Sequence, residues 1–203
     1  MTGNDRTFSS FACFVVALVF VPLIGRAAAQ HFDAGAQVTF AHSGEFDSTD
    51  TGIGARLSWR LAEMVAADAE IDVFPESFAN RTPFSRRRVE GLFGVIAGPR
   101  LGSLRPFAKV RPGFARFRGA PVVCIQIFPP PLSCLLAAGR TLFALDIGGG
   151  VDVSTGGPFV VRFDAGDRLL KYPGPSFRGG GRTAQDSFFG HDLRVSVGAG
   201  VTF

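Results

Sequence analysis

The chain has 203 residues, of which 21 are lysine or arginine and 17 are aspartate or glutamate, so its formal net charge is +4. This balance is too mild to indicate a nucleic-acid-binding protein, which would concentrate basic residues. The length fits one domain of ordinary size.

The first 29 residues have the pattern of a secretory signal peptide. A polar start, "MTGNDR", precedes the apolar run "TFSSFACFVVALVFVPLIG", and small residues follow at Ala27 and Ala29. We expect cleavage between Ala29 and Gln30, so that residues 1–29 are removed and residues 30–203 form the mature domain. The apolar run is shorter than the ~20 residues that a spanning helix needs, which disfavours an uncleaved anchor.

Apolar and polar residues alternate with a period of two along almost the whole mature chain. The alternation predicts eight strands, in chain order residues 32–41, 52–61, 67–74, 87–97, 106–117, 141–153, 158–167 and 192–203. Long polar connections (42–50, 75–87, 118–140, 170–187) take turns with short ones (62–66, 98–105, 154–157). This pattern predicts an all-β fold, an eight-stranded antiparallel up-and-down transmembrane β-barrel.

A soluble barrel also alternates, but its apolar face points inward, so the two faces have to be assigned. Glycines such as Gly148, Gly150 and Gly198 share the charged face, where they leave room for long side chains in a narrow lumen. Aromatic residues on the apolar face gather near strand ends, as expected for girdles at two membrane interfaces. They are Phe32, Trp59, Phe159 and Phe203 on the turn side and Phe40 and Phe143 on the loop side. The charged face is therefore predicted to be the inside.

The last strand carries the most specific motif, "SVGAGVTF". With it, residues 30–203 resemble the small eight-stranded outer-membrane barrels of the OmpA and OmpX kind, within the wider porin family. Such barrels end in a polar residue, a glycine, a hydrophobic residue and a final aromatic. Ser196, Gly198, Val201 and Phe203 match, although Val201 replaces the usual aromatic. The resemblance implies that this segment is read by the barrel-assembly machinery and that the protein is in the outer membrane.

The inward positions predict a network of opposite charges in the lumen. Its members are Arg56, Arg60, Asp68, Glu70, Asp72, Arg88, Glu90, Lys109, Arg111, Asp146, Asp152, Arg162, Asp164, Asp192 and Arg194. A selective pore usually has a ring of one sign, whereas mixed charges in a narrow lumen pair with one another. We therefore interpret the interior as plugged, with a narrow pore for small solutes as the alternative.

Catalytic and metal sites are not indicated. The histidines are His31, His42 and His191, and none has a serine and an acid placed to form a triad. His42 and His191 can approach one another where the first and last strands pair, but two ligands make an incomplete metal site. We predict no enzyme activity and no cofactor.

Residues 119–139 carry no charge, yet Pro129, Pro130 and Pro131 interrupt them, so we expect a loop rather than a helix. Cys124 and Cys134 flank the prolines and are predicted to form a disulfide in an exported protein. This bond would hold an apolar knob formed by Ile125, Ile127, Phe128 and Leu132. The knob is predicted to bind a partner, and the alternative is a loop that packs on the barrel mouth.

Taken together, the sequence predicts a non-enzymatic integral outer-membrane barrel whose loops act in surface interaction or envelope integrity. Expected partners are outer-membrane lipid and lipopolysaccharide, because loop-side arginines suit phosphate groups, and a host or cell-surface ligand. The less favoured alternative to both the plugged barrel and the pore is a secreted soluble barrel that binds a hydrophobic ligand.

Overall fold

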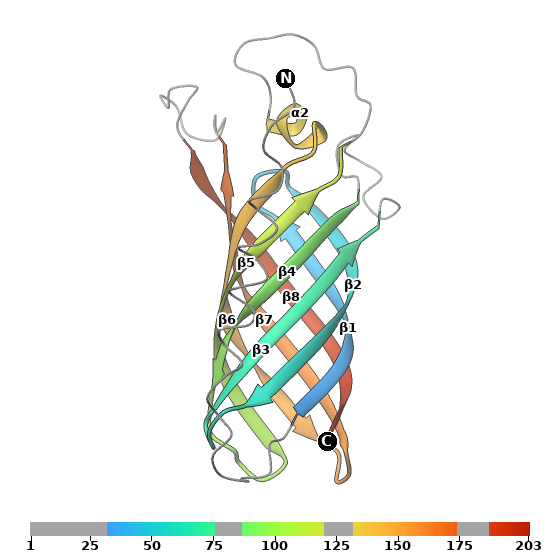
Figure 1. Cartoon of the computed structure of the whole chain (residues 1–203), viewed down its shortest axis with the longest axis vertical. Helices are drawn as coiled ribbons and strands as arrows, with labels where there is room; N and C mark the ends of the chain where they lie inside the picture. The colour runs from blue at the N-terminus through green and yellow to red at the C-terminus, as the bar shows by residue number, and fades with distance from the viewer. Residues whose placement is uncertain (1–31, 76–86, 120–131, 174–186) are drawn as a thin grey trace, which may run out of the picture. The chain divides into compact units, whose positions relative to one another are not determined.

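The described residues of the computed structural model, 32–75, 87–119, 132–173 and 187–203, form a closed eight-stranded barrel (Figure 1). Every strand pairs antiparallel with its neighbour in sequence, and the last strand pairs with the first. The strands are β1 (Phe32–Ser43), β2 (Ser48–Arg60), β3 (Val65–Phe74), β4 (Arg88–Ala97), β5 (Leu104–Phe117), β6 (Thr141–Ser154), β7 (Phe159–Tyr172) and β8 (Phe188–Thr202). The predicted fold class is confirmed.

The expected signal peptide, residues 1–29, lies outside the described residues. Within the described ranges, no helix combines the length and the apolar character needed to cross a membrane.

Several strands are longer than the sequence pattern predicted. The expected first loop, residues 42–50, is mostly strand, because β1 and β2 continue to a turn that contains only residues 44–47. This turn is tight enough to need a positive φ of 49° at Asp47. β7 continues to Tyr172 and β8 begins at Phe188, beyond the expected ends. The added residues raise the loop-side rim of the barrel.

The uncharged segment 119–139 was expected to be a loop throughout, but its end is a short helix, α2 (Leu132–Ala137). Leu132 and Leu136 are four residues apart and therefore lie on one face of this helix. Both are buried. Figure 1 shows α2 at the end of the barrel opposite the C-terminus, so apolar contacts hold it at the loop-side mouth.

Neighbouring strands approach each other most closely at glycines on the inner face. A Cβ atom at Gly148 of β6 would lie 2.1 Å from the carbonyl oxygen of Ala165 and 2.5 Å from the Cα atom of Gly166 in β7. Both atoms belong to the backbone, which cannot move away as the end of a side chain can. Glycine therefore permits the curvature of this narrow barrel as well as leaving room in the lumen.

The outer surface of the barrel is apolar. Twenty-four large hydrophobic side chains of the described residues are exposed, and they include Ile53, Phe93, Val110, Ile147 and Phe163 on different strands. Such a belt is far larger than the apolar patch of an ordinary soluble protein surface.

The predicted aromatic positions lie at the two ends of the belt. At the turn-side end the rings of Phe32 and Trp59 stack with centroids 6.0 Å apart, and the Phe203 amide donates a 2.8 Å hydrogen bond to the Phe32 carbonyl. Toward the loop side, Phe143 is opposite Phe114 across β5 and β6. These rings are placed as membrane-interface aromatics are.

Replacing Gly148 with alanine should lower the free energy of unfolding by about 2 kcal/mol, because the new methyl group overlaps the β7 backbone. Gly157→Ala is the matched control, since a Cβ atom there meets no atom within 4 Å. Urea unfolding of both variants in lipid vesicles, followed by Trp59 fluorescence, measures the difference. Equal stability of the two variants would contradict the close approach.

Candidate functional site

The interior of the barrel is the candidate functional site, and it is layered along the barrel axis. Near the loop side it holds a hydrophobic cluster, and near the turn side it holds a small cluster of Ala66, Ile96 and Phe107. The inward positions of the strands between them carry charged side chains. The loop-side cluster consists of Leu92, Ala115, Phe117, Leu132, Leu136, Leu142, Ala144, Leu170, Tyr172 and Phe188.

Arg111, in the middle of β5, is the centre of the charged layer. Its guanidinium is fully buried and donates hydrogen bonds to carboxylates from three other strands. Nη1 lies 2.8 Å from Asp68 and 2.9 Å from Glu70, and Nη2 lies 2.5 Å from Asp146 and 3.3 Å from Asp164. One cation therefore links β3, β6 and β7 across the lumen.

A second arginine, Arg162 of β7, binds the turn-side part of the network. Its Nε and Nη2 donate to the two oxygens of Asp152 at 2.6 and 2.9 Å, which is the bidentate geometry of strong charge-assisted pairs. Its Nη1 donates to Asp68 at 2.9 Å, and Ser58 donates to the same carboxylate at 2.5 Å. Asp68 thus joins Arg162 to Arg111.

The loop-side half of the network is built in the same way. Arg194 of β8 binds Glu70 and Asp72, the latter at 2.6 Å. Arg168 of β7 binds Glu90 and Asp192. Arg88 of β4 forms an ion pair with Glu90 at 2.6 Å and donates a hydrogen bond to Asp50 at 3.1 Å. Most of these pairs connect strands that are not neighbours in the barrel, so the network crosses the lumen; the exceptions are Arg168–Asp192, on adjacent strands, and Arg88–Glu90, within β4.

All the predicted lumen residues are buried except Arg60, which is partly exposed at the turn-side end. Two other buried arginines of the lumen, Arg105 and Arg168, were not predicted from the sequence, because the sequence pattern placed them at or beyond strand ends. Continuing the alternation would have found both, since Arg105 shares the parity of Lys109 and Arg168 that of Asp164.

The buried charges of the described residues are balanced. The bases are Arg56, Arg88, Arg105, Lys109, Arg111, Arg162, Arg168 and Arg194, and the acids are Asp68, Glu70, Asp72, Glu90, Asp146, Asp152, Asp164 and Asp192. Moving charged groups out of water costs free energy, and this cost is offset only where each group is paired and hydrogen-bonded. Most of these groups are paired. The arrangement differs from a ring of one sign, which selects ions in a pore.

Leu132 does not belong to an exposed knob, which corrects the prediction for this residue. It is 4% exposed and packs in the loop-side hydrophobic cluster, because α2 turns its Leu132 and Leu136 face toward the mouth. The other knob residues, Ile125, Ile127 and Phe128, lie outside the described residues. Cys124 also lies outside them, and the side chain of Cys134 is not described, so the disulfide stays a prediction.

The histidines of the rim each have their own neighbours. His42 Nδ1 lies 3.0 Å from the Thr49 hydroxyl, and His191 Nδ1 lies 2.7 Å from an Asp167 oxygen. In the described parts of the chain, no three histidine, cysteine, aspartate or glutamate residues are grouped so that they could hold a metal ion.

A basic groove lies at the loop-side rim of β4, β5 and β6. It has a volume of about 420 Å³, and the described residues that line it include no acidic side chain. Arg116 lies between Val89 and Thr141 in the strand register. The four arginines that line the groove are exposed, namely Arg87, Arg116, Arg118 and Arg140.

The terminal motif occupies β8 and the residue after it. Ser196 is buried in the lumen, whereas Phe203 is 73% exposed. That Ser196, Gly198, Val201 and Phe203 form an assembly signal stays a prediction.

The fold and the inside-out arrangement of charge define a class, the small eight-stranded outer-membrane β-barrel. No family model and no curated protein sequence matches the chain. Among solved structures, Neisserial surface protein A is 14% identical with a TM-score of 0.51, and the match covers 88% of this chain and all of that one. This similarity establishes the fold.

Two further solved barrels are similar at lower scores. The N-terminal β-barrel domain of Pseudomonas aeruginosa OprF is 10% identical, with 84% and 97% of the two chains covered and a TM-score of 0.45. The attachment invasion locus protein Ail of Yersinia pestis is 13% identical, with 86% and 97% covered and a TM-score of 0.42.

The distribution of side chains contradicts one alternative, the soluble barrel that binds a hydrophobic ligand. Such a barrel needs an apolar interior and a polar exterior. Here Arg111 and Arg194 are inside, and Ile53 and Phe93 are outside.

The two lysines of the chain form a matched pair that tests the network. Lys109 is buried and binds Asp146 and Asp164, so Lys109→Met leaves these carboxylates with one cation fewer. The free energy of unfolding should fall by about 3 kcal/mol. Lys171 points outward and is exposed, so Lys171→Met should change it by less than about 0.5 kcal/mol. Urea unfolding in lipid vesicles measures both, and a neutral Lys109→Met would contradict the network.

Proposed function

We propose that this protein is a non-enzymatic, non-conducting integral barrel of the outer membrane that holds its loops at the cell surface. The single observation that carries the proposal is the inside-out distribution of charge: an apolar belt outside and a paired ionic network inside. The loops act in surface interaction or in envelope integrity.

The apolar belt supports insertion in a lipid bilayer. A barrel satisfies all of its strand hydrogen bonds internally, so lipid can surround it without a free sheet edge. Transfer of the exposed Phe93 and Ile53 side chains from water to hydrocarbon is favourable in free energy. By analogy with barrels of this fold, the short turns face the periplasm and the loop-side rim faces outward.

The internal network and the loop-side cluster support a closed lumen. Arg111, Arg168 and Arg194 are among the largest fully buried side chains, and their guanidiniums bind carboxylates on other strands. An ion that crossed would have to separate several of these pairs at once. Above them, Leu132 and Leu136 of α2 join the apolar cluster at the mouth, and an apolar constriction also opposes the passage of ions.

Purified protein in planar lipid bilayers should therefore show no unitary current steps. Charge reversal at Arg162 removes its hydrogen bonds to Asp152 and leaves buried acids unpaired, so it should destabilise the barrel. It should not open a pore, because the other inward side chains still occupy the lumen. Insertion is verified by the shift of the unboiled protein on a gel. Reproducible current steps from the wild-type protein, absent after boiling, would favour the narrow pore instead.

We further propose that the basic groove binds phosphate groups of lipopolysaccharide in the outer leaflet. The groove attracts anions, because no acid is among its described lining residues, which include four arginines: Arg87, Arg116, Arg118 and Arg140. Guanidinium groups present paired donors to phosphate oxygens. The position of Arg116 beside outward-facing Val89, at the rim above the apolar belt, fits the level of lipid headgroups.

The triple variant Arg116→Gln, Arg118→Gln, Arg140→Gln should bind lipid A about a hundredfold more weakly, since each rim cation contributes about 1 kcal/mol. Binding is measured by titrating detergent-solubilised barrel with lipid A. The control is Lys171→Gln, which removes a charge elsewhere on the rim. Equal affinity of the triple variant and the wild type would refute the lipid site.

A further inference from the structure

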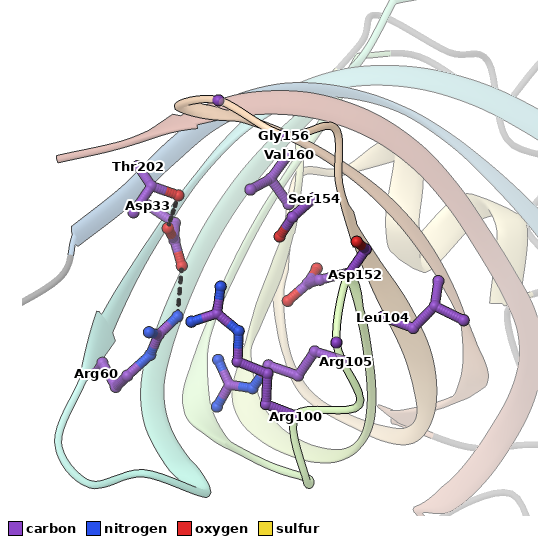
Figure 2. A pocket seen from close by; sticks show the side chains of 13 residues that line it. Asp33, Arg60, Arg100, Leu104, Arg105, Asp152, Ser154, Gly156, Val160 and Thr202 are labelled. Carbon is purple, nitrogen blue, oxygen red and sulfur yellow. Dashed lines mark hydrogen bonds and ion pairs between the residues drawn. The ribbon is translucent and has the colours of Figure 1, made fainter.

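A second, separate cavity opens at the turn-side mouth of the lumen, opposite the basic groove (Figure 2). It has a volume of about 430 Å³ and is lined by the ends of β1, β2, β5, β6, β7 and β8 and by the β4–β5 and β6–β7 turns. This volume is in the range of small-molecule sites.

Three arginines point into this cavity from different elements. Arg60 ends β2, Arg100 belongs to the turn between β4 and β5, and Arg105 is near the start of β5. Figure 2 shows their guanidinium groups directed toward one another. Like charges repel one another, so an anion bound among these groups would be stabilised.

The two acids of the lining, Asp33 and Asp152, compensate only part of this charge. Both oxygens of Asp152 accept hydrogen bonds from Arg162, which lies deeper in the lumen. Asp33 accepts a 2.5 Å hydrogen bond from Thr202 and is 3.9 Å from Arg60, beyond hydrogen-bond distance. The cavity therefore keeps an excess of positive charge.

The unpartnered, buried donors of Arg105 point to a ligand. Arg105 is only 6% exposed, and its Nε and Nη2 are buried without a hydrogen-bond partner among the described residues. Arg60 Nε is also buried without a hydrogen-bond partner among the described residues. Buried donors of a charged group are unfavourable without a partner, and an anion in the cavity would satisfy them.

We propose that this cavity binds a phosphate group that carries a small polyol. Several guanidiniums match the charge and the tetrahedral oxygens of phosphate better than those of a single carboxylate. The space beyond the arginines is lined by the hydroxyl residues Ser103, Ser154 and Thr202, which suit the hydroxyl groups of a polyol. The source is either a soluble phosphate ester or the headgroup of a glycerophospholipid.

The test uses the full barrel in phosphatidylcholine nanodiscs, titrated calorimetrically with glycerol 3-phosphate at constant ionic strength. We expect saturable binding, and a dissociation constant raised about tenfold or more by Arg105→Gln and also by Arg100→Gln. Arg100 is an exposed turn residue, so its variant keeps the test valid should Arg105→Gln fail to fold. Lys171→Gln, with the same loss of charge, should bind like the wild type.

A second arm adds phosphatidylglycerol to the nanodiscs. Loss of glycerol 3-phosphate binding in these discs identifies the lipid headgroup as the occupant, and unchanged binding identifies the soluble ester. No binding of glycerol 3-phosphate at millimolar concentration in either disc, or equal affinity of the wild type and both arginine variants, would overturn the proposal.

Discussion

The structure depends on one constraint: every strand alternates its side chains between two environments of opposite polarity. Closing eight strands satisfies the backbone hydrogen bonds within the sheet, which makes an apolar exterior possible. The charged residues then have only the lumen left, where burial forces them to pair. Arg111, with four carboxylates around it, is the clearest result of that requirement. The apolar belt and the ionic network are thus two consequences of one pattern.

The narrowness of the barrel explains several other features. Eight strands enclose a narrow space, and the described side chains that point into its middle are mainly ionic rather than hydrocarbon. Glycines such as Gly148 let adjacent backbones approach where the wall curves. The two ends differ: the loop-side mouth is covered by apolar residues that include Leu136 of α2, whereas the turn-side mouth keeps arginines around a cavity. The proposed phosphate-binding cavity therefore lies at the turn-side mouth, whereas the proposed lipid-binding groove lies at the loop-side rim.

The sequence predicted the strand number, the topology and the inward face, because a period of two is set by the backbone itself. It failed at strand ends. Asp50 and Arg168 were assigned to loops or left between elements because they are charged, but beyond the membrane boundary charged residues continue the strands. Leu132 was assigned to an exposed loop because a local pattern cannot show that a helix folds back onto the barrel mouth. The pairs of the network depend on positions across the lumen, which no local pattern contains.

The central claim, lipid outside and ions inside, is tested most directly by two tryptophan positions on β7 and β5, the two strands that flank β6. In a Trp59→Phe background, Phe163→Trp places the fluorophore on the outer face, and Phe107→Trp places it inside. The two positions lie at a similar level of the barrel, because Phe163 is opposite Val151 and Val151 pairs with Pro106, the neighbour of Phe107. Vesicles of brominated phosphatidylcholine quench fluorophores that contact acyl chains. The account predicts strong quenching at position 163 and little at position 107. Equal quenching at both positions, or stronger quenching at position 107, would contradict it.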